Sequence, residues 1–362
     1  MKIAVVVLLV MVGFAVWWQQ TAPPMDPLAY RPPTAPGLVG PFSANTRLRQ
    51  AQRLGDGLID GGEDVAVDAL GRIYAGTADG RILRLKANAD SDSRPELFAN
   101  TGGRPLGLHF DAAGNLWVAD AWKGLLSVAA DGEVQVRLGE VDGVPLHFSN
   151  DLDIAADGRI YFTDSSRFSQ PQYMLDAFEA RAHGRLIRYD PITDQATVLL
   201  DGLYFANGVA LNRDDDFVLV NETWRYRTLR LWLKGPKAGT HEVFIDNLPG
   251  FPDGIAADEQ GGFWLALPTL RNAVLDRIHP YPWLKSLIAR LPTEWQPLPE
   301  RYGLVAHLDQ QGRVLESLHD PGGEQVFEIT SVQPVADRLY LGTLHNQWIA
   351  RLPIENAAAD QP

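Results

Sequence analysis

Pairs of bulky apolar residues recur six times along the chain, each directly after a short turn that carries glycine or aspartate. The second residue of each pair is separated from the next by 43, 44, 57, 46 and 76 residues. A repeat of about forty to fifty residues with strand-like alternation is typical of propeller blades. The pattern therefore predicts an all-β, six-bladed β-propeller. These second residues are Tyr74, Trp117, Tyr161, Val218, Trp264 and Tyr340.

An open stack of hairpins is the alternative architecture, but it would leave long strand edges exposed, which closure into a ring removes. Two intervals are longer than the others and locate insertions at 167–182 and about 272–301. In the first, Met174, Leu175 and Phe178 have helical spacing. Both insertions follow the second strand of a blade, so we expect them to be lids over the channel mouth. The alternative is that the insertions only lie on the outer rim of the propeller and do not cover the channel.

A ring of oxygen donors emerges from the same repeat. Eleven residues before each of the six positions, where the innermost strand begins, stand Glu63, Leu106, Asn150, Asn207, Asp253 and Ile329. Equivalent positions in a closed propeller surround the axis, so the two carboxylates and two amides should converge. Buried carboxylates are unfavourable unless they are paired or bind a metal, and no Lys or Arg occupies these positions.

All-oxygen ligands suit Ca²⁺. We therefore predict that Glu63, Asn150, Asn207 and Asp253 bind one calcium ion as cofactor. A water-filled channel lined by hydrogen-bonded polar residues is the alternative.

The N-terminus predicts a membrane segment. Ile3 to Trp18 contain no charge, and Lys2 precedes them. We interpret residues 1–21 as a signal anchor that places the rest of the chain on the non-cytoplasmic side, in the periplasm or a lumen. A cleavable signal peptide that releases a secreted protein is the alternative. Residues 22–43 are rich in proline and predict an extended spacer, residues 44–356 form the propeller, and residues 357–362 are a tail.

Composition narrows the class of function. The formal net charge of −13 argues against a nucleic-acid partner, and the absence of cysteine excludes disulfides and thiolate chemistry. His345 lies on a predicted loop at the lid end, where it is a candidate general base. The candidate substrate contacts are Leu106, Asp164, Met174, Phe178, Glu222, Trp224 and Arg271. A structural role is the alternative for His345 and for the polar loop residues.

Segments 148–155, 158–166, 205–209 and 250–254 resemble the strictosidine-synthase-like family, including its membrane-anchored animal branch. The chain is similar, more remotely, to gluconolactonases, paraoxonases and diisopropyl-fluorophosphatase. The resemblance covers about 54–352 and implies a six-bladed propeller whose calcium is held by Glu63, Asn150, Asn207 and Asp253. It also implies hydrolysis of lactones, aryl esters or phosphotriesters in several branches.

Two positions depart from the relatives. Thr330 stands where strictosidine synthase has its catalytic glutamate, which disfavours amine–aldehyde condensation. Leu106 stands where paraoxonases have a histidine. The sequence thus predicts a calcium-dependent hydrolase of small-molecule esters or lactones, in which Asp253 or Glu63 activates water. A non-catalytic propeller with structural calcium, which binds a partner or a small molecule, is the alternative.

Overall fold

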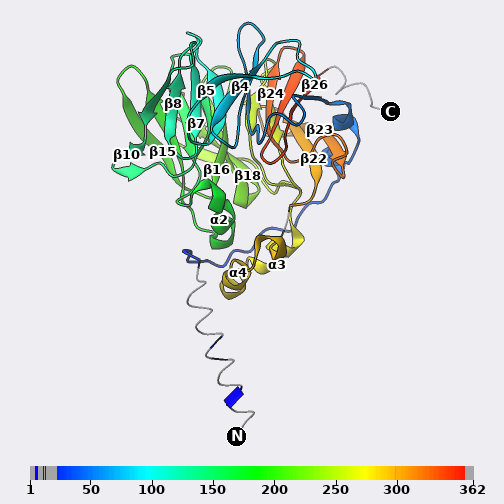
Figure 1. The fold of residues 1–362 in the computed structure, drawn as a ribbon. Helices are drawn as coiled ribbons and strands as arrows, with labels where there is room; N and C mark the ends of the chain where they lie inside the picture. Colours follow the sequence, from blue (N-terminus) through cyan, green and yellow to red (C-terminus); the bar gives the residue numbers. More distant parts are fainter. Residues whose placement is uncertain (1–4, 7–10, 12, 14–22, 298, 355–362) are drawn as a thin grey trace.

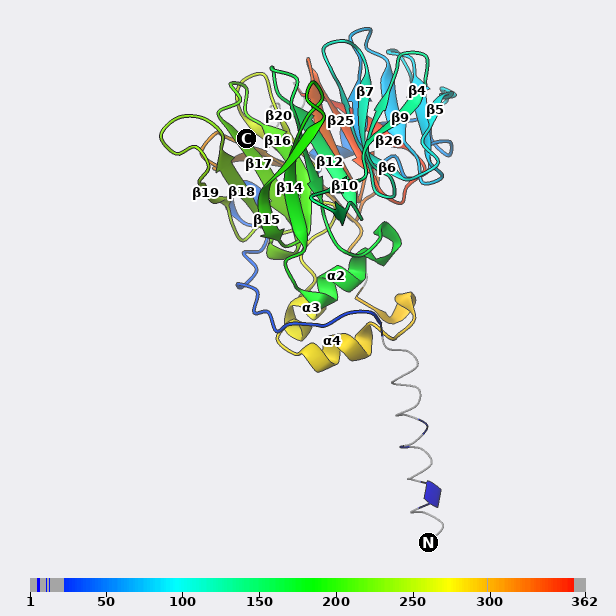
Figure 2. The same ribbon diagram turned by 90° about the vertical axis from the view of Figure 1, so that its left-hand side faces the viewer.

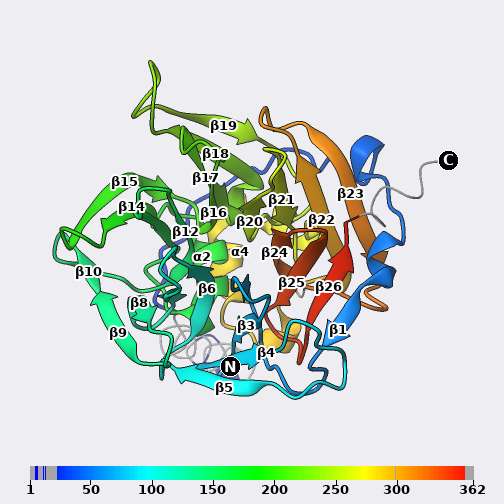
Figure 3. The same ribbon diagram turned by 90° about the horizontal axis from the view of Figure 1, so that it is seen from above.

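The computed structural model describes residues 5, 6, 11, 13, 23–297 and 299–354. Six four-stranded antiparallel sheets surround one central axis (Figure 3), which confirms the predicted six-bladed β-propeller. The first three blades contain β2 (Val65–Val67), β3 (Ile73–Gly76), β4 (Arg81–Leu85) and β5 (Glu96–Asn100); β6 (Pro105–Phe110), β7 (Leu116–Asp120), β8 (Gly124–Val128) and β9 (Val134–Leu138); and β12 (Ser149–Ile154), β13 (Ile160–Asp164), β14 (Gly184–Asp190) and β15 (Gln195–Leu203).

The other three blades complete the ring. The fourth contains β16 (Ala206–Leu211), β17 (Phe217–Glu222), β18 (Arg227–Trp232) and β19 (His241–Ile245), and the fifth contains β20 (Ile255–Ala257), β21 (Phe263–Ala266), β22 (Tyr302–Leu308) and β23 (Val314–Pro321). The sixth combines β24 (Ile329–Val335), β25 (Arg338–Thr343) and β26 (Ile349–Pro353) with β1 (Gln52–Leu54) from the opposite end of the chain. A short hairpin, β10 (Glu140–Val141) and β11 (Val144–Pro145), precedes the third blade in the sequence.

Pairing between β1 and β26 closes the ring, with Gln52 opposite Arg351 and Leu54 opposite Ile349. Arg53 adds a side-chain contact, since its guanidinium lies 4.9 Å from the centre of the Trp348 ring. The two ends of the folded chain therefore stabilise the same sheet. Closure of this kind leaves no open gap between the first and last blades.

The recurring turn between the two inner strands is held by an acidic or amide side chain. Asp111 accepts hydrogen bonds from the backbone N–H of Ala113 and Asn115, at 2.9 and 2.8 Å. Its other oxygen accepts the indole N–H of Trp117 at 3.0 Å, and in the first blade Asp68 accepts the Tyr74 hydroxyl at 3.1 Å. In these two blades the bulky residue of the repeat therefore packs in the core, while its polar atom is hydrogen-bonded to the turn.

Glycines allow the inner strands to approach one another. Gly107, Gly208 and Gly254 each follow a ring position. A Cβ on Gly208 would lie 2.1 Å from the carbonyl oxygen of Asp253 in the next blade, and one on Gly107 would lie 2.7 Å from the Cα of Asp151. The narrow axis of the propeller therefore depends on the absence of side chains at these positions.

Both insertions are helical lids on one face. The first forms η3 (Gln170–Gln172) and α2 (Tyr173–Glu179), and the second forms α3 (Ala273–Ile278), α4 (Pro282–Ile288) and η5 (Thr293–Trp295). The Asn272 side chain accepts the N–H of Val274 and Leu275, which caps α3, and Pro282 occupies the first turn of α4. Figure 1 shows the helices together below the propeller.

The proline-rich segment is extended but is not a free spacer. Its backbone crosses the lids (Figure 2), where the N–H of Leu28 binds the Glu179 carbonyl at 2.8 Å and that of Tyr30 binds the His279 carbonyl at 3.0 Å. These hydrogen bonds hold the stretch against the lids, so here it does not act as a free spacer. Sequence analysis missed the contacts because the partners lie far away in the sequence. Two short 3₁₀ turns, η1 (Gly40–Phe42) and η2 (Arg47–Gln50), lead from it to β1.

Within the described part of the chain, no helix is long and apolar enough to cross a membrane. The predicted anchor at 1–21 falls almost entirely outside the described residues, as does the tail at 357–362. Both stay predictions.

We predict that Gly208→Ala lowers the free energy of unfolding by about 3 kcal/mol or more, because the new methyl group would overlap the backbone of the next blade. Gly139→Ala is the matched control, since a Cβ at that position would have nothing within 4 Å, and it should change stability by less than about 0.5 kcal/mol. Urea unfolding of both variants provides the measurement. Equal stability of the two would contradict the close-packed axis.

Candidate functional site

A cavity of about 120 Å³ lies at the lid end of the channel. The four predicted oxygen donors all line it, and so does Leu106. They come from or just before the innermost strands of four blades, because Asn150 lies on β12 and Asn207 on β16, while Glu63 precedes β2 and Asp253 precedes β20. The structure therefore brings together the residues that the repeat predicted. We call Glu63, Asn150, Asn207 and Asp253 the oxygen ring.

Two buried carboxylates face this cavity. Glu63 is 7% exposed and Asp253 9% exposed, and neither forms an ion pair with a basic side chain of the described residues. Burial, followed by repulsion from Asp253, raises the pKa of Glu63 well above its usual value. Burial likewise raises the pKa of Asp253, with Asp151 as the next cause. A divalent cation between them would compensate the charge that the surroundings disfavour.

Hydrogen bonds fix the orientation of both ring amides. The Ser165 hydroxyl donates to the Ala206 carbonyl at 2.6 Å and can therefore only accept from Asn150, whose Nδ2 lies 2.9 Å away. In the next blade, Thr223 donates to the Pro252 carbonyl at 2.8 Å and accepts from Asn207 Nδ2 at 3.2 Å. Because each amide nitrogen is bound to a hydroxyl, the amide oxygen is the atom available for coordination.

The backbone beneath the ring is held by polar side chains of neighbouring strands. The Thr163 hydroxyl donates to the Asn207 carbonyl at 2.8 Å, and the Thr330 hydroxyl donates to the Glu63 carbonyl at 2.7 Å. Asn221 Nδ2 donates to the Asp253 carbonyl. Each of these three ring residues is thus positioned by a side chain from an adjacent blade, which makes the ring a rigid feature of the closed propeller.

The sixth blade differs from the prediction. Ile329 is fully buried in the core between the fifth and sixth blades, while Glu328 and Thr330 line the cavity. Tyr340 pairs with Gln333, seven residues earlier, whereas Trp117 of the second blade pairs with His109, eight residues earlier, so the count along the sixth blade is displaced by one residue and Thr330 takes the expected position. Glu328 is therefore a third cavity carboxylate that counting along the repeat did not identify.

His345 is not placed as a general base. Its Nδ1 lies 2.6 Å from Glu328 Oε1, its side chain is 56% exposed, and it does not line the cavity. The hydrogen bond to Glu328 raises the pKa of His345. Its position outside the cavity gives no support to a role as general base, which stays a prediction.

Four other predicted substrate contacts have structural roles. Asp164 is buried, 2.6 Å from Arg185, and accepts the N–H of Phe148 at 2.8 Å. Glu222 pairs with Arg227 and accepts the N–H of Tyr204. None of Asp164, Glu222, Arg271 and Phe178 lines the cavity.

Arg271 pairs with Asp276 at 2.9 Å and donates to the Pro33 carbonyl at 2.6 Å, so it binds the proline-rich segment to α3. Phe178 is completely buried on the core side of α2. In each case an ion pair or packing in the apolar core keeps the side chain out of the channel.

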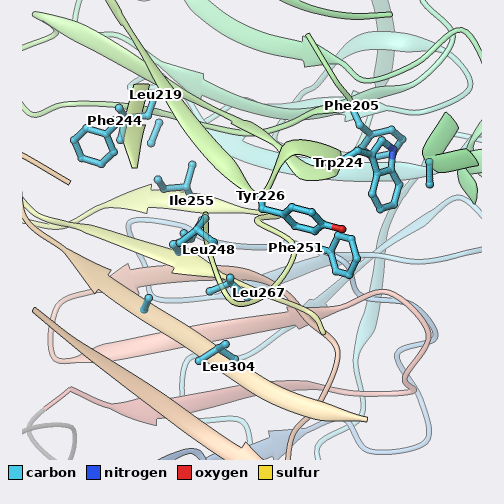
Figure 4. Close-up of a cluster of buried hydrophobic side chains, with 14 of the residues drawn as sticks. Phe205, Leu219, Trp224, Tyr226, Phe244, Leu248, Phe251, Ile255, Leu267 and Leu304 are labelled. Carbon is cyan, nitrogen blue, oxygen red and sulfur yellow. The ribbon is translucent and has the colours of Figure 1, made fainter. Parts of the chain in front are cut away.

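The remaining cavity wall is apolar and aromatic. Figure 4 shows Phe205, Trp224 and Phe251 close together beside the core of the fourth and fifth blades. The ring centres of Phe205 and Trp224 are 5.1 Å apart, and those of Trp224 and Phe251 are 5.6 Å apart. The predicted contacts Met174 and Trp224 line this wall with Leu275 of α3. A hydrophobic ligand would therefore rest against the aromatic wall with its polar group toward the oxygen ring.

A second polar cavity of about 120 Å³ lies further along the channel. Asp64, Asp151 and Asp153 line it, and each accepts a backbone N–H from the next blade: those of Leu108 (2.8 Å), Val209 (2.9 Å) and Leu211 (2.7 Å). Burial is the first cause that raises the pKa of all three carboxyls. In the sequence, Asp64 directly follows Glu63, Asp151 directly follows Asn150, and Asp153 lies three residues after Asn150. This spacing from the oxygen ring is the signal that could have identified them.

The oxygen ring fits a hard cation by its chemistry, since it combines two carboxylates with two oriented amides. No set of three or more His, Cys, Asp or Glu side chains in the described ranges has metal-binding geometry by itself. The amides are therefore needed for a complete donor set. Glu63, Asn150, Asn207 and Asp253 are the residues that would hold the ion.

The fold and the site define a six-bladed propeller with an oxygen-lined channel beneath helical lids. Similar solved structures include a gluconolactonase from Xanthomonas campestris, with a TM-score of 0.62 and 19% identity over 92% of this chain and 98% of that one. Regucalcin from Agrobacterium tumefaciens, described as a calcium-binding protein, has a TM-score of 0.59 and 18% identity over 83% and 93% of the two chains. At these identities the similarity shows the fold alone.

Sequence comparison identifies the family. The strictosidine synthase model matches residues 150–236, and the model for the strictosidine synthase-like N-terminal region matches residues 40–85. Adipocyte plasma membrane-associated protein from Homo sapiens is 37% identical, covering 92% of this chain and 84% of the relative. Strictosidine synthase-like 10 from Arabidopsis thaliana is 40% identical, covering 78% and 83%. The chain belongs to the strictosidine synthase-like family.

We expect one lid contact to respond to pH. Asp176 of α2 is fully buried, and its carboxylate is hydrogen-bonded to the Ser166 hydroxyl. Burial raises the pKa of Asp176 to about 7. The unfolded chain loses this proton near pH 4, whereas the folded chain retains it until about pH 7, so this group destabilises the fold as the pH rises between those values.

We therefore predict that Asp176→Asn raises Tm relative to the wild type more at about pH 8 than at about pH 5, because the amide keeps a polar partner for Ser166 and does not ionise. Calorimetry at the two pH values measures the difference. Glu140→Gln, at an exposed position, is the control and should show no such pH dependence. A Tm difference for Asp176→Asn that is independent of pH would contradict the assignment.

Proposed function

We propose that this protein is a calcium-dependent hydrolase of carboxylic esters or lactones. The observation that carries the proposal is the pair of buried carboxylates, Glu63 and Asp253, beside two oriented amides at one side of a largely apolar cavity. The solved propellers of similar fold include one described as a gluconolactonase and one described as a calcium-binding protein, which supports the same class of chemistry.

When bound, the cation would polarise the substrate carbonyl and stabilise the negative charge that develops on its oxygen. Residues of this chain supply the other parts of the mechanism. Asn150 and Asn207 would hold the ion through their amide oxygens, because their nitrogens are bound to Ser165 and Thr223. Asp253 or Glu63 accepts the proton of the attacking water, because a carboxylate in a poorly solvated site is a stronger base than one in water.

The cavity wall selects the substrate. Met174 and Leu275 belong to the two lids, whereas Phe205 and Trp224 belong to the fourth blade, so a bound acyl or ring group would be enclosed from both sides. The apolar lining favours esters or lactones with hydrocarbon substituents.

Location is part of the proposal. The relatives from Rattus norvegicus and Homo sapiens are named adipocyte plasma membrane-associated protein, and the first residues of this chain have the composition of a signal anchor. We propose that residues 1–21 anchor the protein with its propeller on the non-cytoplasmic side. A partner-binding propeller without catalysis is the competing function, and turnover by the wild-type protein separates the two.

We predict that Asp253→Asn and Glu63→Gln each abolish the rise in Tm that calcium gives the wild type. Ligand binding to the native state at about 100 times Kd adds about 2.7 kcal/mol of stability, and this increment requires both carboxylates. Calorimetric titration and thermal unfolding with and without calcium measure the effect. Asp92→Asn and Glu140→Gln, at exposed positions, are charge-matched controls that should retain it. An undiminished response in both ring variants would overturn the site.

We further predict that Met174→Ala changes kcat/KM selectively for bulky esters, by about 1–3 kcal/mol of discrimination relative to small ones. Asn207→Ala should instead lower kcat for all esters by a similar factor, because its oxygen acts in the transition state. Leu175→Ala, on the same helix but not lining the cavity, is the control for the lid. Selective loss in Asn207→Ala with uniform loss in Met174→Ala would reverse these roles.

A further inference from the structure

Three large aromatic side chains on the second lid are exposed to solvent. Tyr281 is 52% exposed, Trp283 64% and Trp295 73%. They belong to one stretch, Tyr281–Trp295, which contains α4 and η5 and which we call the lid face. Tryptophan usually buries most of its surface, so a group of exposed aromatic rings marks a surface that meets another phase or molecule.

The apolar N-terminal segment joins the folded protein at this same lid assembly. The Pro24 carbonyl accepts a hydrogen bond from Arg167 at 3.0 Å, and the Leu28 carbonyl accepts one from Lys285 of α4. Figure 2 shows the proline-rich segment, from Pro23 on, passing along α3 and α4. Only four residues separate Trp18 from Pro23. Even fully extended, this connection spans at most about 18 Å.

The connection therefore limits how far the C-terminal end of the uncharged stretch Ile3 to Trp18 can lie from Pro23, beside the lids. If that stretch enters a bilayer, the bilayer surface lies on the lid side of the propeller. Trp and Tyr are the side chains enriched at membrane interfaces, because their apolar rings enter the headgroup region while their polar atoms stay hydrated. The short connection and the chemistry of the rings thus point to the same partner.

We propose that the lid face docks on the lipid bilayer and that Trp283 and Trp295 insert into its interfacial layer. The cavity mouth then opens beside the membrane, since Pro297, two residues after Trp295, lines the cavity together with Leu275 of α3. The substrate class follows: amphiphilic esters or lactones that partition into the membrane and enter between the lids. This substrate consequence rests on the proposed function, whereas the docking does not.

The chain has no cysteine, so single-cysteine variants of the full-length protein can be labelled at one site each. Trp283→Cys and Trp295→Cys would carry an environment-sensitive fluorophore, and the protein would be reconstituted into phosphatidylcholine vesicles isolated by flotation. Ile192→Cys is the control, because Ile192 is 87% exposed in the turn between β14 and β15, at the end of the propeller opposite the lids.

Lipid carrying a nitroxide near its headgroup should reduce the fluorescence of both lid labels by about twofold, which is the expectation for groups in the interfacial layer. The label at 192 should be unaffected. Lid labels as bright as the control would overturn the proposal. Protection of the lid labels from aqueous iodide without quenching by lipid would assign the face to a second protein molecule and would overturn it as well.

A substrate test separates docking from catalysis. The double variant Trp283→Gln, Trp295→Gln should lose about fivefold in kcat/KM for a long-chain ester dissolved in the vesicles and retain its activity on a short water-soluble ester, as expected when only access from the interface is impaired. Equal loss on both esters would contradict the substrate class. Absence of hydrolysis of either ester by the wild type would defeat the proposed function and leave the lipid-quenching result to decide the docking.

Discussion

Burial of two like charges at the axis of a closed ring is the constraint on which the rest of this structure depends. Glu63 and Asp253 come from the first and fifth blades, and each is nearly inaccessible to water. Burial and repulsion from neighbouring carboxylates raise the pKa values of both carboxyls, so the site without a cation favours protonation. A divalent ion at this point would convert an unfavourable arrangement into one that holds blades together and activates a carbonyl.

The surrounding architecture maintains that arrangement. Serine and threonine hydroxyls fix the ring amides, and further side chains hold the ring carbonyls in place. Glycines after the ring positions let neighbouring inner strands approach so closely that a methyl group would not fit. Pairing of β1 with β26 then closes the circle. Fold and site are therefore coupled, since loss of closure would separate the donors.

Periodicity predicted those features that repeat with the blades. The six turns, the two lids and the four donors of the oxygen ring follow from one spacing, because equivalent strands of a propeller are equivalent in space. The prediction failed at Ile329, because the pairing offset between β24 and β25 is one residue shorter than that between β6 and β7; Thr330 and Glu328 line the cavity instead. It also missed β1, whose three residues are too short to show a pattern and whose partner is at the other end of the chain.

Individual loop residues were less predictable for a different reason. Asp164, Glu222 and Arg271 are polar and lie near the lid end, yet each is bound by a local ion pair that composition does not reveal. The proline-rich segment likewise resembled a spacer because its partners, such as Glu179 and His279, lie far along the chain from Leu28 and Tyr30. Long-range hydrogen bonds of this kind leave no periodic signal.

Anomalous X-ray diffraction from crystals grown with calcium tests the central claim most directly. The account predicts one strong peak inside the oxygen ring, at about 2.3–2.6 Å from carboxylate oxygens of Glu63 and Asp253 and from the amide oxygens of Asn150 and Asn207. A ring without a peak, in crystals with calcium in the medium well above millimolar concentration, would contradict it. So would a single peak confined to the second cavity, among Asp64, Asp151 and Asp153.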